Sequence, residues 1–295
     1  MNPACQPFEP GSLRSRLQAT TASALASGAL QPIPTASETL VQDEIEFRVR
    51  ISANVERKVT VQHQRQKRSP DFNPFLPYEA ALFVADFSPT HLCLLNKFNV
   101  VEHHALIVTR AFEPQTDWLN ERDFAALWQG LCEFDSLGFY NAGAGAGASQ
   151  RHKHLQLVPL PLAGAMTGLP ISPAIARAEF TGGCGRLPAF DFPHALSRLD
   201  ASLPPVMGAV AARAAYQQLL AHLGIHTTEQ AHNVLATRDW LLIVPRSQPE
   251  VAGIGINSLG FAGSFFVRDR PQLALLQNLQ PLNVLRTAAI ADTKV

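Results

Sequence analysis

Three short apolar runs between residues 79 and 109 constrain the fold of this chain more than any other feature. The runs read ALFVADF, HLCLLNKF and HALIVT, and turn-forming residues separate them. Runs of aliphatic, β-branched and aromatic residues with this length and spacing are typical of successive β-strands. Two further runs, HNVLA and WLLIVPRS, follow in the second half of the chain. We therefore expect strands in both halves.

Helical patterns stand beside these strands. Residues 12–30, 208–224 and 271–287 are expected to form helices. The clearest pattern is NERDFAALWQGLCEFDSLG at 120–138, which has a capping Asn120 and is closed by Gly138. Its apolar residues recur at helical spacing and are expected to enter the core: Phe124, Leu127, Trp128, Leu131 and Phe134. Strands, a helix, more strands and a terminal helix indicate an α+β fold with an antiparallel sheet.

The chain divides into four expected parts. Residues 1–78 form an N-terminal segment of loops and short strands, and residues 79–160 carry the first set of strands. Residues 161–205 are rich in Pro, Gly and Ala and are expected to hold little regular structure. Residues 206–295 form the C-terminal half.

Charge and apolar content exclude two classes of partner. Among 295 residues, 24 are basic and 24 acidic, so the formal net charge is zero. A balanced chain does not present the broad basic surface that nucleic acid requires, although a small phosphate site needs only a few local charges. No apolar run approaches the roughly 18 residues of a membrane span. We expect neither a nucleic acid nor a membrane as partner, and the oligomeric state stays open.

The cysteines and the N-terminus indicate the cytoplasm. Four scattered cysteines form no C-x-x-C pair and are typical of free thiols in a reducing compartment. The first residues, MNPACQPFEPGSLRSR, lack the apolar core of a secretory signal.

One segment, GAGAGASQRHKHLQLV at 143–158, carries the chemistry. Its glycines resemble those of nucleotide-phosphate loops, but a Rossmann loop follows a strand and opens a helix, and a P-loop ends in G-K-[ST]. Here we expect the segment to follow a helix and to enter a strand. Small residues still allow backbone N–H groups to approach phosphate oxygens. Taken alone, the run is equally compatible with a flexible linker.

The strand after the glycines places three polar side chains on one face. Side chains at i, i+2 and i+4 share a face of a strand, so His152, His154 and Gln156 line one surface, opposite Lys153, Leu155 and Leu157. Two histidines could bind zinc, but a third ligand would have to come from afar. They could also be ordinary core or surface histidines.

Phosphoryl chemistry fits the order of glycines and histidines better. A neutral imidazole held in one tautomer is a good nucleophile toward phosphorus, provided that donors stabilise charge on the phosphoryl oxygens. Glycine amides, the hydroxyl of Ser149 and the amide of Gln156 can supply such donors. The sequence therefore predicts a phosphate-binding loop followed by a nucleophile.

The chain resembles the histidine-triad superfamily, and within it the H-x-H-x-Q branch of diadenosine tetraphosphate (Ap4A) phosphorylase, or ATP adenylyltransferase. Four blocks in the same order carry the resemblance: LLNKFNVVEHHALIVT, GASQRHKHLQLV, HNVLATRDWLLIVPRS and INSLGFAGSFFVR. The resemblance covers most of the chain from residue 79 onward. It implies a HIT-like antiparallel sheet with flanking helices.

The resemblance also implies roles for individual residues. His154, the middle histidine of the motif, would be the nucleophile, Gln156 would take the place of a third histidine, and His152 would orient the site. Arg268 stands where a lysine is expected, and the glycine run has more alanine than the family pattern, which leaves Asn141 to supply a polar contact. The expected substrate-binding residues are Lys58, Asn96, Lys97, Asn141, Gly145, Gly147, Ala148, Ser149, Gln150, Asn257, Ser258, Leu259, Ser264 and Arg268.

The implied activity is phosphorolysis of Ap4A to ATP and ADP, reversible, through an adenylyl-histidine intermediate. The partners would be dinucleoside polyphosphates, ATP, ADP and phosphate. No covalent cofactor is expected, and Mg²⁺ is compatible with the reaction. Two alternatives stay open: a uridylyltransferase acting on sugar phosphates, and a nucleotide-binding module without catalysis. A metal-binding protein is the least favoured interpretation.

Overall fold

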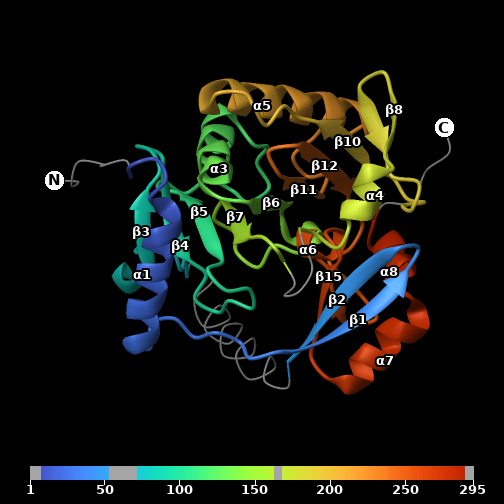
Figure 1. Cartoon of the computed structure of the whole chain (residues 1–295), viewed down its shortest axis with the longest axis horizontal. Coiled ribbons are helices and arrows are strands. Elements are labelled where there is room, and N and C mark those ends of the chain that lie inside the picture. The colour runs from blue at the N-terminus through green and yellow to red at the C-terminus, as the bar shows by residue number, and fades with distance from the viewer. Residues whose placement is uncertain (1–7, 53–71, 163–167, 290–295) are drawn as a thin grey trace.

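The structure is a computed structural model that describes residues 8–52, 72–162 and 168–289. A ten-stranded sheet runs through the centre of the molecule (Figure 1). Its strands lie in the order β3-β4-β5-β7-β6-β11-β12-β10-β9-β8, and each neighbouring pair is antiparallel. Their bounds are β3 Phe83–Asp86, β4 His91–Leu95, β5 Ala105–Thr109, β6 Ser136–Ala142, β7 His154–Pro159, β8 Glu179–Thr181, β9 Cys184–Arg186, β10 Ala195–Arg198, β11 His232–Ala236 and β12 Trp240–Pro245.

The two halves of the sequence meet inside this sheet. Strand β6 of the first half pairs with β11 of the second, with Asn141 opposite Asn233 and Gly138 opposite Ala236. Both strands are buried along their whole length. The sheet therefore continues across three of the four expected parts of the chain.

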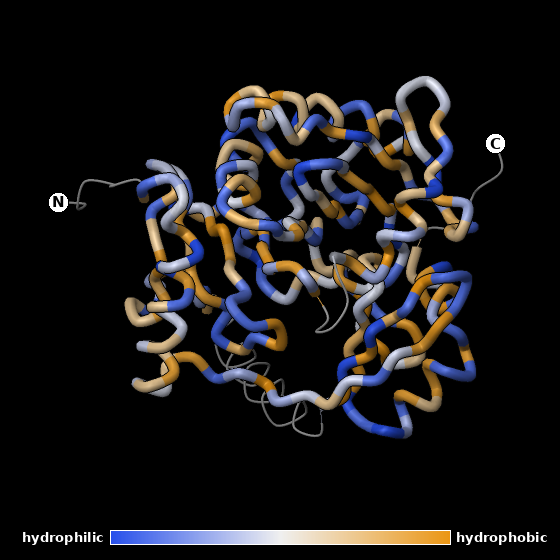
Figure 2. The backbone as a smooth tube through the Cα atoms, in the orientation of Figure 1, coloured by the Kyte–Doolittle hydropathy of each residue, from blue (hydrophilic) through white to orange (hydrophobic). Residues whose placement is uncertain are grey.

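Each face of the sheet has its own core. On one face, Leu155, Leu157 and Val234 pack with the helices α1 (Leu13–Ala26), α3 (Glu121–Glu133) and α5 (Pro205–His222). On the other, Phe139 and Leu235 pack with the C-terminal elements. Successive side chains of a strand point to opposite faces, so neighbouring residues enter different cores. Figure 2 shows apolar stretches along the central strands and along the helices that cover them.

The layer on the second face is a small sheet with several helices. Strands β1 (Ala36–Gln42), β2 (Ile45–Ile51) and β15 (Ser264–Val267) form a three-stranded sheet in which β2 and β15 run parallel. The other elements are the hairpin of β13 (Glu250–Val251) and β14 (Ile254–Gly255), and helices α4 Ser172–Ala176, α6 Ser258–Phe261, α7 Arg270–Leu279 and α8 Pro281–Ala288.

The expected helix at 120–138 begins as predicted and ends early. Asn120 caps it through a capping box with Asp123. The helix stops at Glu133, and the chain is extended from Phe134 into β6, so Gly138 lies in a strand. The glycine run therefore follows a strand, which corrects our expectation. A nucleotide loop of Rossmann type remains excluded, because only a three-residue 3-10 turn, Ala144–Ala146, follows the strand.

Two further expectations need correction. Residues 161–205 contain more regular structure than expected, since β10 pairs with β12 in the central sheet and the β8–β9 hairpin extends it. The expected helix at 271–287 is two helices, because the chain turns at Gln280, where φ is +68°. The α+β class, with an antiparallel sheet and flanking helices, is confirmed.

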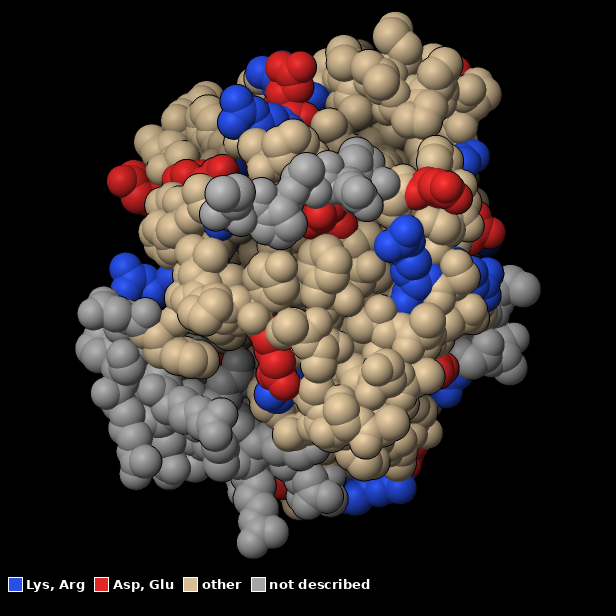
Figure 3. Space-filling model, turned by 90° about the vertical axis from the view of Figure 1, so that its left-hand side faces the viewer, with Lys and Arg blue, Asp and Glu red and all other residues tan. Residues whose placement is uncertain are grey.

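The surface agrees with the balanced charge of the chain. On the face shown in Figure 3, basic and acidic side chains are interspersed among uncharged ones. No described helix is both long and apolar enough to cross a membrane.

Candidate active site

The imidazole of His154 is held in one tautomer. His154 opens strand β7 and is only 5% exposed. Its Nδ1 lies 2.8 Å from the carbonyl oxygen of His152. A carbonyl only accepts, so Nδ1 carries the proton and Nε2 keeps its lone pair. Burial lowers the pKa of His154 to about 4, so the ring is neutral near pH 7.

His152 is fixed from the other side. Its Nε2 lies 2.7 Å from the carbonyl oxygen of Thr109 and 2.9 Å from the Thr109 hydroxyl, and its Nδ1 lies 2.9 Å from Nδ2 of Asn73. The Phe75 ring contacts both His152 and His154, with centroids 5.6 and 5.4 Å away. The two imidazoles therefore lie together as predicted, but His152 precedes strand β7 and forms an isolated bridge with Pro114. His152 thus aims its carbonyl at His154 from an anchored position.

Gln115, which sequence reasoning missed, clamps the backbone of His154. Its side-chain oxygen accepts from the His154 N–H at 2.8 Å, and its side-chain nitrogen donates to the His154 carbonyl at 3.2 Å. Its own carbonyl accepts from the Tyr140 hydroxyl at 2.5 Å and from the Gly143 N–H at 3.0 Å. Gln115 therefore ties His154 to strand β6 and to the glycine run.

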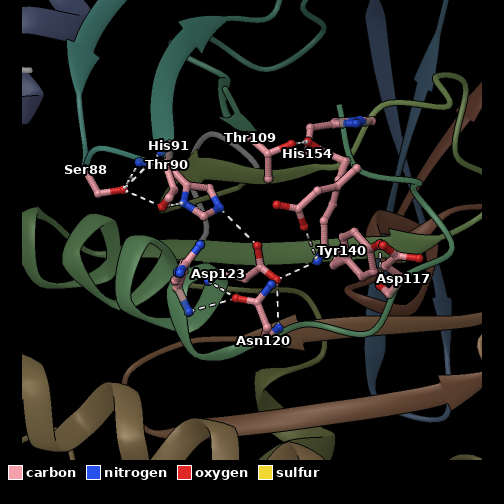
Figure 4. A network of polar contacts seen from close by, with 12 residues as sticks. Ser88, Thr90, His91, Thr109, Asp117, Asn120, Asp123, Tyr140 and His154 are labelled. Carbon is pink, nitrogen blue, oxygen red and sulfur yellow. Dashed lines mark hydrogen bonds and ion pairs between the residues drawn. The ribbon is translucent and has the colours of Figure 1, made fainter. Parts of the chain in front are cut away.

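A buried ionic network surrounds Lys153, the residue that directly precedes β7. Figure 4 shows its part around His91 and Asp123. Nζ of Lys153, 1% exposed, lies 2.7 Å from Asp123 and 3.1 Å from Glu113. Asp123 also bonds Nε2 of His91 at 3.0 Å. Burial alone would raise the pKa of Asp123, but the bonds from His91 and Lys153 outweigh it and hold that pKa below its ordinary value. Lys153 thus points into helix α3 while its two neighbours face the site.

Gln156 is bonded to a histidine that the sequence analysis did not single out. Oε1 of Gln156 lies 2.9 Å from Nε2 of His104, whose Nδ1 lies 3.3 Å from Nδ2 of Asn96. Asn96, expected to bind nucleotide, is therefore linked to Gln156 of strand β7 through one side chain, His104.

The glycine run forms a tight turn rather than an open row of amides. Gly143 and Gly147 have φ of +79° and +88°, where a side chain would be strained. A Cβ on Gly147 would lie 2.4 Å from the carbonyl oxygen of Ile256. The amides of Gly143 and Gly147 donate to carbonyls of the protein itself. Fewer glycine amides than expected are thus available to a phosphate.

The backbone amides of Ala144 and Gly145, at the start of that turn, are not used within the turn. Within the described residues, the N–H groups of Ala144 and Gly145 donate to no protein acceptor. Ala144 is exposed, Gly145 and Ala148 are half-buried, and Ser149 and Gln150 follow before the histidines. These positions are where backbone donors could meet a ligand.

A polar network joins the glycine run to the C-terminal half. Oδ1 of Asn141 accepts from Nδ2 of Asn233 at 2.8 Å and from the backbone N–H and hydroxyl of Ser258 at 2.9 and 2.7 Å. The buried Arg246 donates to Oδ1 of Asn233 at 2.5 Å and to the carbonyls of Ala146 and Ile256 at 3.2 and 3.1 Å. Sequence reasoning missed both Asn233 and Arg246, whose bonds to Asn141 and Ala146 span 92 and 100 residues.

Asn257, Ser258 and Leu259 lie at the start of α6, against this network. Asn257 caps the helix by accepting from the N–H of Leu259 at 2.9 Å. A Cβ on Gly147 would lie 3.1 Å from Cα of Asn257. The structure therefore brings the predicted 257–259 segment beside the predicted glycine run.

Within the part of the chain that the structure describes, no hydrogen bond or ion pair joins the remaining predicted residues to His154. Lys97 forms an ion pair with Glu79 at 2.6 Å. Ser264 lies on β15 of the small sheet, and Arg268, just after β15, faces Asp269 at 3.8 Å. Lys58 lies outside the described residues.

The described residues contain no group of three or more His, Cys, Asp or Glu side chains placed to hold a metal ion. A cavity of about 470 Å³ lies beside the β1–β2 turn and is lined by Glu44, Arg177, Asp191 and Arg286, among others. None of its lining residues belongs to the predicted site.

Comparisons with known proteins match the chain along most of its length. Residues 3–177 match the model of the Ap4A phosphorylase N-terminal domain, and residues 188–291 match that of the ATP adenylyltransferase C-terminal domain. Diadenosine 5′,5‴-P1,P4-tetraphosphate phosphorylase 2 of Saccharomyces cerevisiae is 26% identical over 208 residues. That alignment covers 61% of this chain and 63% of the yeast protein, which is less than two thirds of its length.

Solved structures show the same fold. The crystal structure of yeast Ap4A phosphorylase Apa2 in complex with Ap4A superposes with a TM-score of 0.78 at 23% identity, and covers 97% of this chain and 100% of that one. The same enzyme in complex with AMP gives 0.77 at 24%, over 98% of this chain and 100% of that one. The whole described fold, from the central sheet to the small sheet, therefore has a solved counterpart.

Proposed function

The chain belongs to the Ap4A phosphorylase family, and from that premise we propose that it phosphorolyses diadenosine tetraphosphate to ATP and ADP, reversibly, through adenylylated His154. One observation carries the proposal. A buried, neutral imidazole donates its only proton to the His152 carbonyl and keeps an unprotonated Nε2 that has no hydrogen-bond partner among the described residues. That is the state a nucleophile toward phosphorus requires.

In the first half-reaction, the lone pair of His154 Nε2 forms a bond to the α-phosphorus of one adenylate. The bond from that phosphorus to its bridging oxygen breaks, the bridging oxygen keeps the electron pair, and ATP leaves. The proton on Nδ1 stays in its hydrogen bond with the His152 carbonyl, which stabilises the positive charge that the ring acquires.

In the second half-reaction, an oxygen of inorganic phosphate attacks the adenylyl phosphorus. The phosphorus–nitrogen bond breaks, its electrons return to Nε2, and ADP leaves. Each half-reaction exchanges one high-energy phosphorus bond for another, so both directions are accessible. Phosphate brings an anionic oxygen and needs no general base to activate it.

The substrate contacts belong to the same proposal. The free amides of Ala144 and Gly145, with Ser149 and Gln150, would bind phosphoryl oxygens beside His154. The 257–259 segment would close over the nucleotide from the C-terminal half. Lys97, Arg268 and Lys58 would contact the polyphosphate, and for Lys97 this requires release from Glu79. Ser264 would lie along the same path.

Domain organisation and location follow as further proposals. We place the catalytic half at residues 79–160 and the half that completes the nucleotide site at 206–295, linked by 161–205, with 1–78 as an N-terminal segment. The scattered thiols support a cytoplasmic location, where ATP, ADP and phosphate are available.

A product assay tests the activity. Purified protein incubated with Ap4A and phosphate should release equal amounts of ATP and ADP, and His154→Ala should be slower by several orders of magnitude. A variant rate within tenfold of the wild type would contradict covalent catalysis by His154. Parallel incubations with UDP-sugars test the uridylyltransferase alternative. Tight nucleotide binding without any product would instead favour a non-catalytic module.

A further inference from the structure

Three polar side chains form a line across neighbouring strands of the central sheet. Asn96 follows strand β4, His104 precedes β5, and Gln156 lies on β7. The ring of His104 bridges the other two, with Nδ1 at 3.3 Å from Nδ2 of Asn96 and Nε2 at 2.9 Å from Oε1 of Gln156. The Asn96 backbone N–H also donates to the His104 carbonyl at 2.8 Å. His104 is only 6% exposed, so water does not compete for these bonds.

Each bond in this line has a direction. Oδ1 of Asn96 accepts from the Phe98 N–H at 3.3 Å, which leaves Nδ2 facing the histidine. An amide nitrogen only donates, so Nδ1 of His104 must accept. Burial lowers the pKa of His104 to about 4, and the neutral ring has a single proton, which must then sit on Nε2. Nε2–H can donate only to the oxygen end of the Gln156 amide.

The consequence for Gln156 is an assigned orientation. With Oε1 bonded to His104, its –NH₂ end points away from His104. Within the described residues, that nitrogen has no hydrogen-bond partner, and it lies on the same strand face as His154. A transferred phosphoryl group brings anionic oxygens to this face, and they attract an N–H and repel a carbonyl oxygen. An unrestrained amide would present either end.

We propose that His104 is a positioning residue which, set by Asn96, turns the –NH₂ end of Gln156 toward the phosphoryl group transferred to His154. The inference rests on the proposed function. It gives Asn96 a part in the reaction that needs no contact with nucleotide. The proposal also gives His104 a role beyond packing against Phe139, whose ring centroid lies 5.9 Å from that of His104.

A double-mutant cycle separates these two roles. The measurement is the single-turnover rate of protein adenylylation by Ap4A without phosphate. Gln156→Ala should lower it about 100-fold, as loss of a donor to a transition-state oxygen does. His104→Leu should lower it about tenfold in the wild-type background, because the amide loses one orienting hydrogen bond. In the Gln156→Ala background, the same change should cost less than about threefold. An equal cost in both backgrounds would overturn the proposal.

A second measurement, of the histidine tautomers, tests the proposal even if His104→Leu does not fold. Nitrogen-15 shifts of histidine-labelled wild-type protein report the tautomer of each ring. His104, assigned by the signal missing from His104→Leu or His104→Gln, should carry its proton on Nε2, whereas His154 should carry it on Nδ1. A proton on Nδ1 of His104 would overturn the proposal whatever the activity. If the wild type forms no adduct with Ap4A, the proposed function fails, and the tautomer still decides the orientation of Gln156.

Discussion

At the scale of single residues, two carbonyl oxygens fix the proton of His154 and the amide orientation of Gln156 on strand β7. The His152 carbonyl fixes the proton of His154, and the Gln156 carbonyl is occupied by His104. Each oxygen is hydrogen-bonded to a histidine nitrogen within the protein. Both decide which atom of a side chain remains available, an unprotonated nitrogen on His154 and an N–H donor on Gln156.

Gln156→His should change the acceptor in the second half-reaction. A histidine can titrate near neutral pH and help to activate water, which an amide cannot do. The share of AMP formed by hydrolysis, relative to ADP formed by phosphorolysis, should therefore rise. Nucleotide analysis with and without phosphate measures it. An unchanged AMP-to-ADP ratio would mean that the acceptor is selected elsewhere, most simply by the 143–149 loop.

The sequence predicted the polar side chains of strand β7 but not the residues that bond to them. Alternation on a strand was sufficient to place His154 and Gln156 on one face, whereas His152 lies before the strand and contacts the same Phe75 ring as His154. Gln115 and Arg246 act through partners 39 and 100 residues away, His154 and Ala146, and no local pattern contains that information. His104 stood inside a recognised block, but its role depends on a bond to another strand.

At the scale of elements, Gly147 is the glycine of the 143–149 turn at which a side chain would meet the closest contact. Gly147→Ala meets two obstacles: a positive φ, which costs a residue with a side chain roughly 1–2 kcal/mol, and a clash with the Ile256 carbonyl. Gly224 provides a matched control, because its φ is +65° but a Cβ added there would meet no atom within 4 Å. Both alanine variants should be less stable in denaturant titrations.

Only Gly147→Ala should also lower kcat/KM for Ap4A, by about tenfold or more, since displacing the turn moves phosphate donors and the 257–259 segment together. Equal kinetic effects of the two variants would show that the turn does not shape the site.

The buried ion network of Lys153, Asp123 and Glu113, at the start of strand β7, is a second feature at the scale of elements. Lys153→Met leaves Asp123 buried with one fewer cation, and breaking a buried pair costs about 3–5 kcal/mol. The exposed pair of Arg286 and Asp191 is the control, and Arg286→Met should cost less than about 1 kcal/mol. Chemical denaturation compares the two. Similar losses would mean that the network does not anchor the strand.

Errors in predicting the elements have a common physical cause. The apolar spacing of helix α3 continues through Phe134, but the next residues pair with two strands, so tertiary contacts outweigh local periodicity. Strand β10 was not predicted, because the residues around it are rich in Pro and Gly and its pairing with β12 is long-range. The strands recognised correctly, such as β4 and β5 in the runs HLCLLNKF and HALIVT, are marked by the apolar residues of the strand itself.

At the scale of the whole molecule, buried neutral histidines couple folding to pH. Burial lowers the pKa of His104, His154, His194 and His232 to about 4. In the unfolded chain these rings have the ordinary pKa near 6.5. Between these values the unfolded state binds protons that the folded state does not. The free energy of unfolding should therefore fall as the pH drops from about 6.5 toward 4, by roughly 1.4 kcal/mol per ring and pH unit.

Denaturant titrations at about pH 7.5 and pH 5 measure how the free energy of unfolding depends on pH. His194→Gln removes one buried ring outside the site and should reduce that dependence by the contribution of one histidine. A free energy of unfolding that is the same at both pH values would contradict the burial of neutral rings.

The central claim, that His154 becomes covalently adenylylated, has one direct test in intact protein mass. Wild-type protein incubated with Ap4A in the absence of phosphate should gain the mass of one adenylyl group, and it should lose that mass, with release of ADP, when phosphate is added. His154→Ala should gain nothing under the same conditions while remaining folded. A wild-type protein that turns over Ap4A without ever gaining this mass, or an adduct that persists in the His154→Ala variant, would contradict the account.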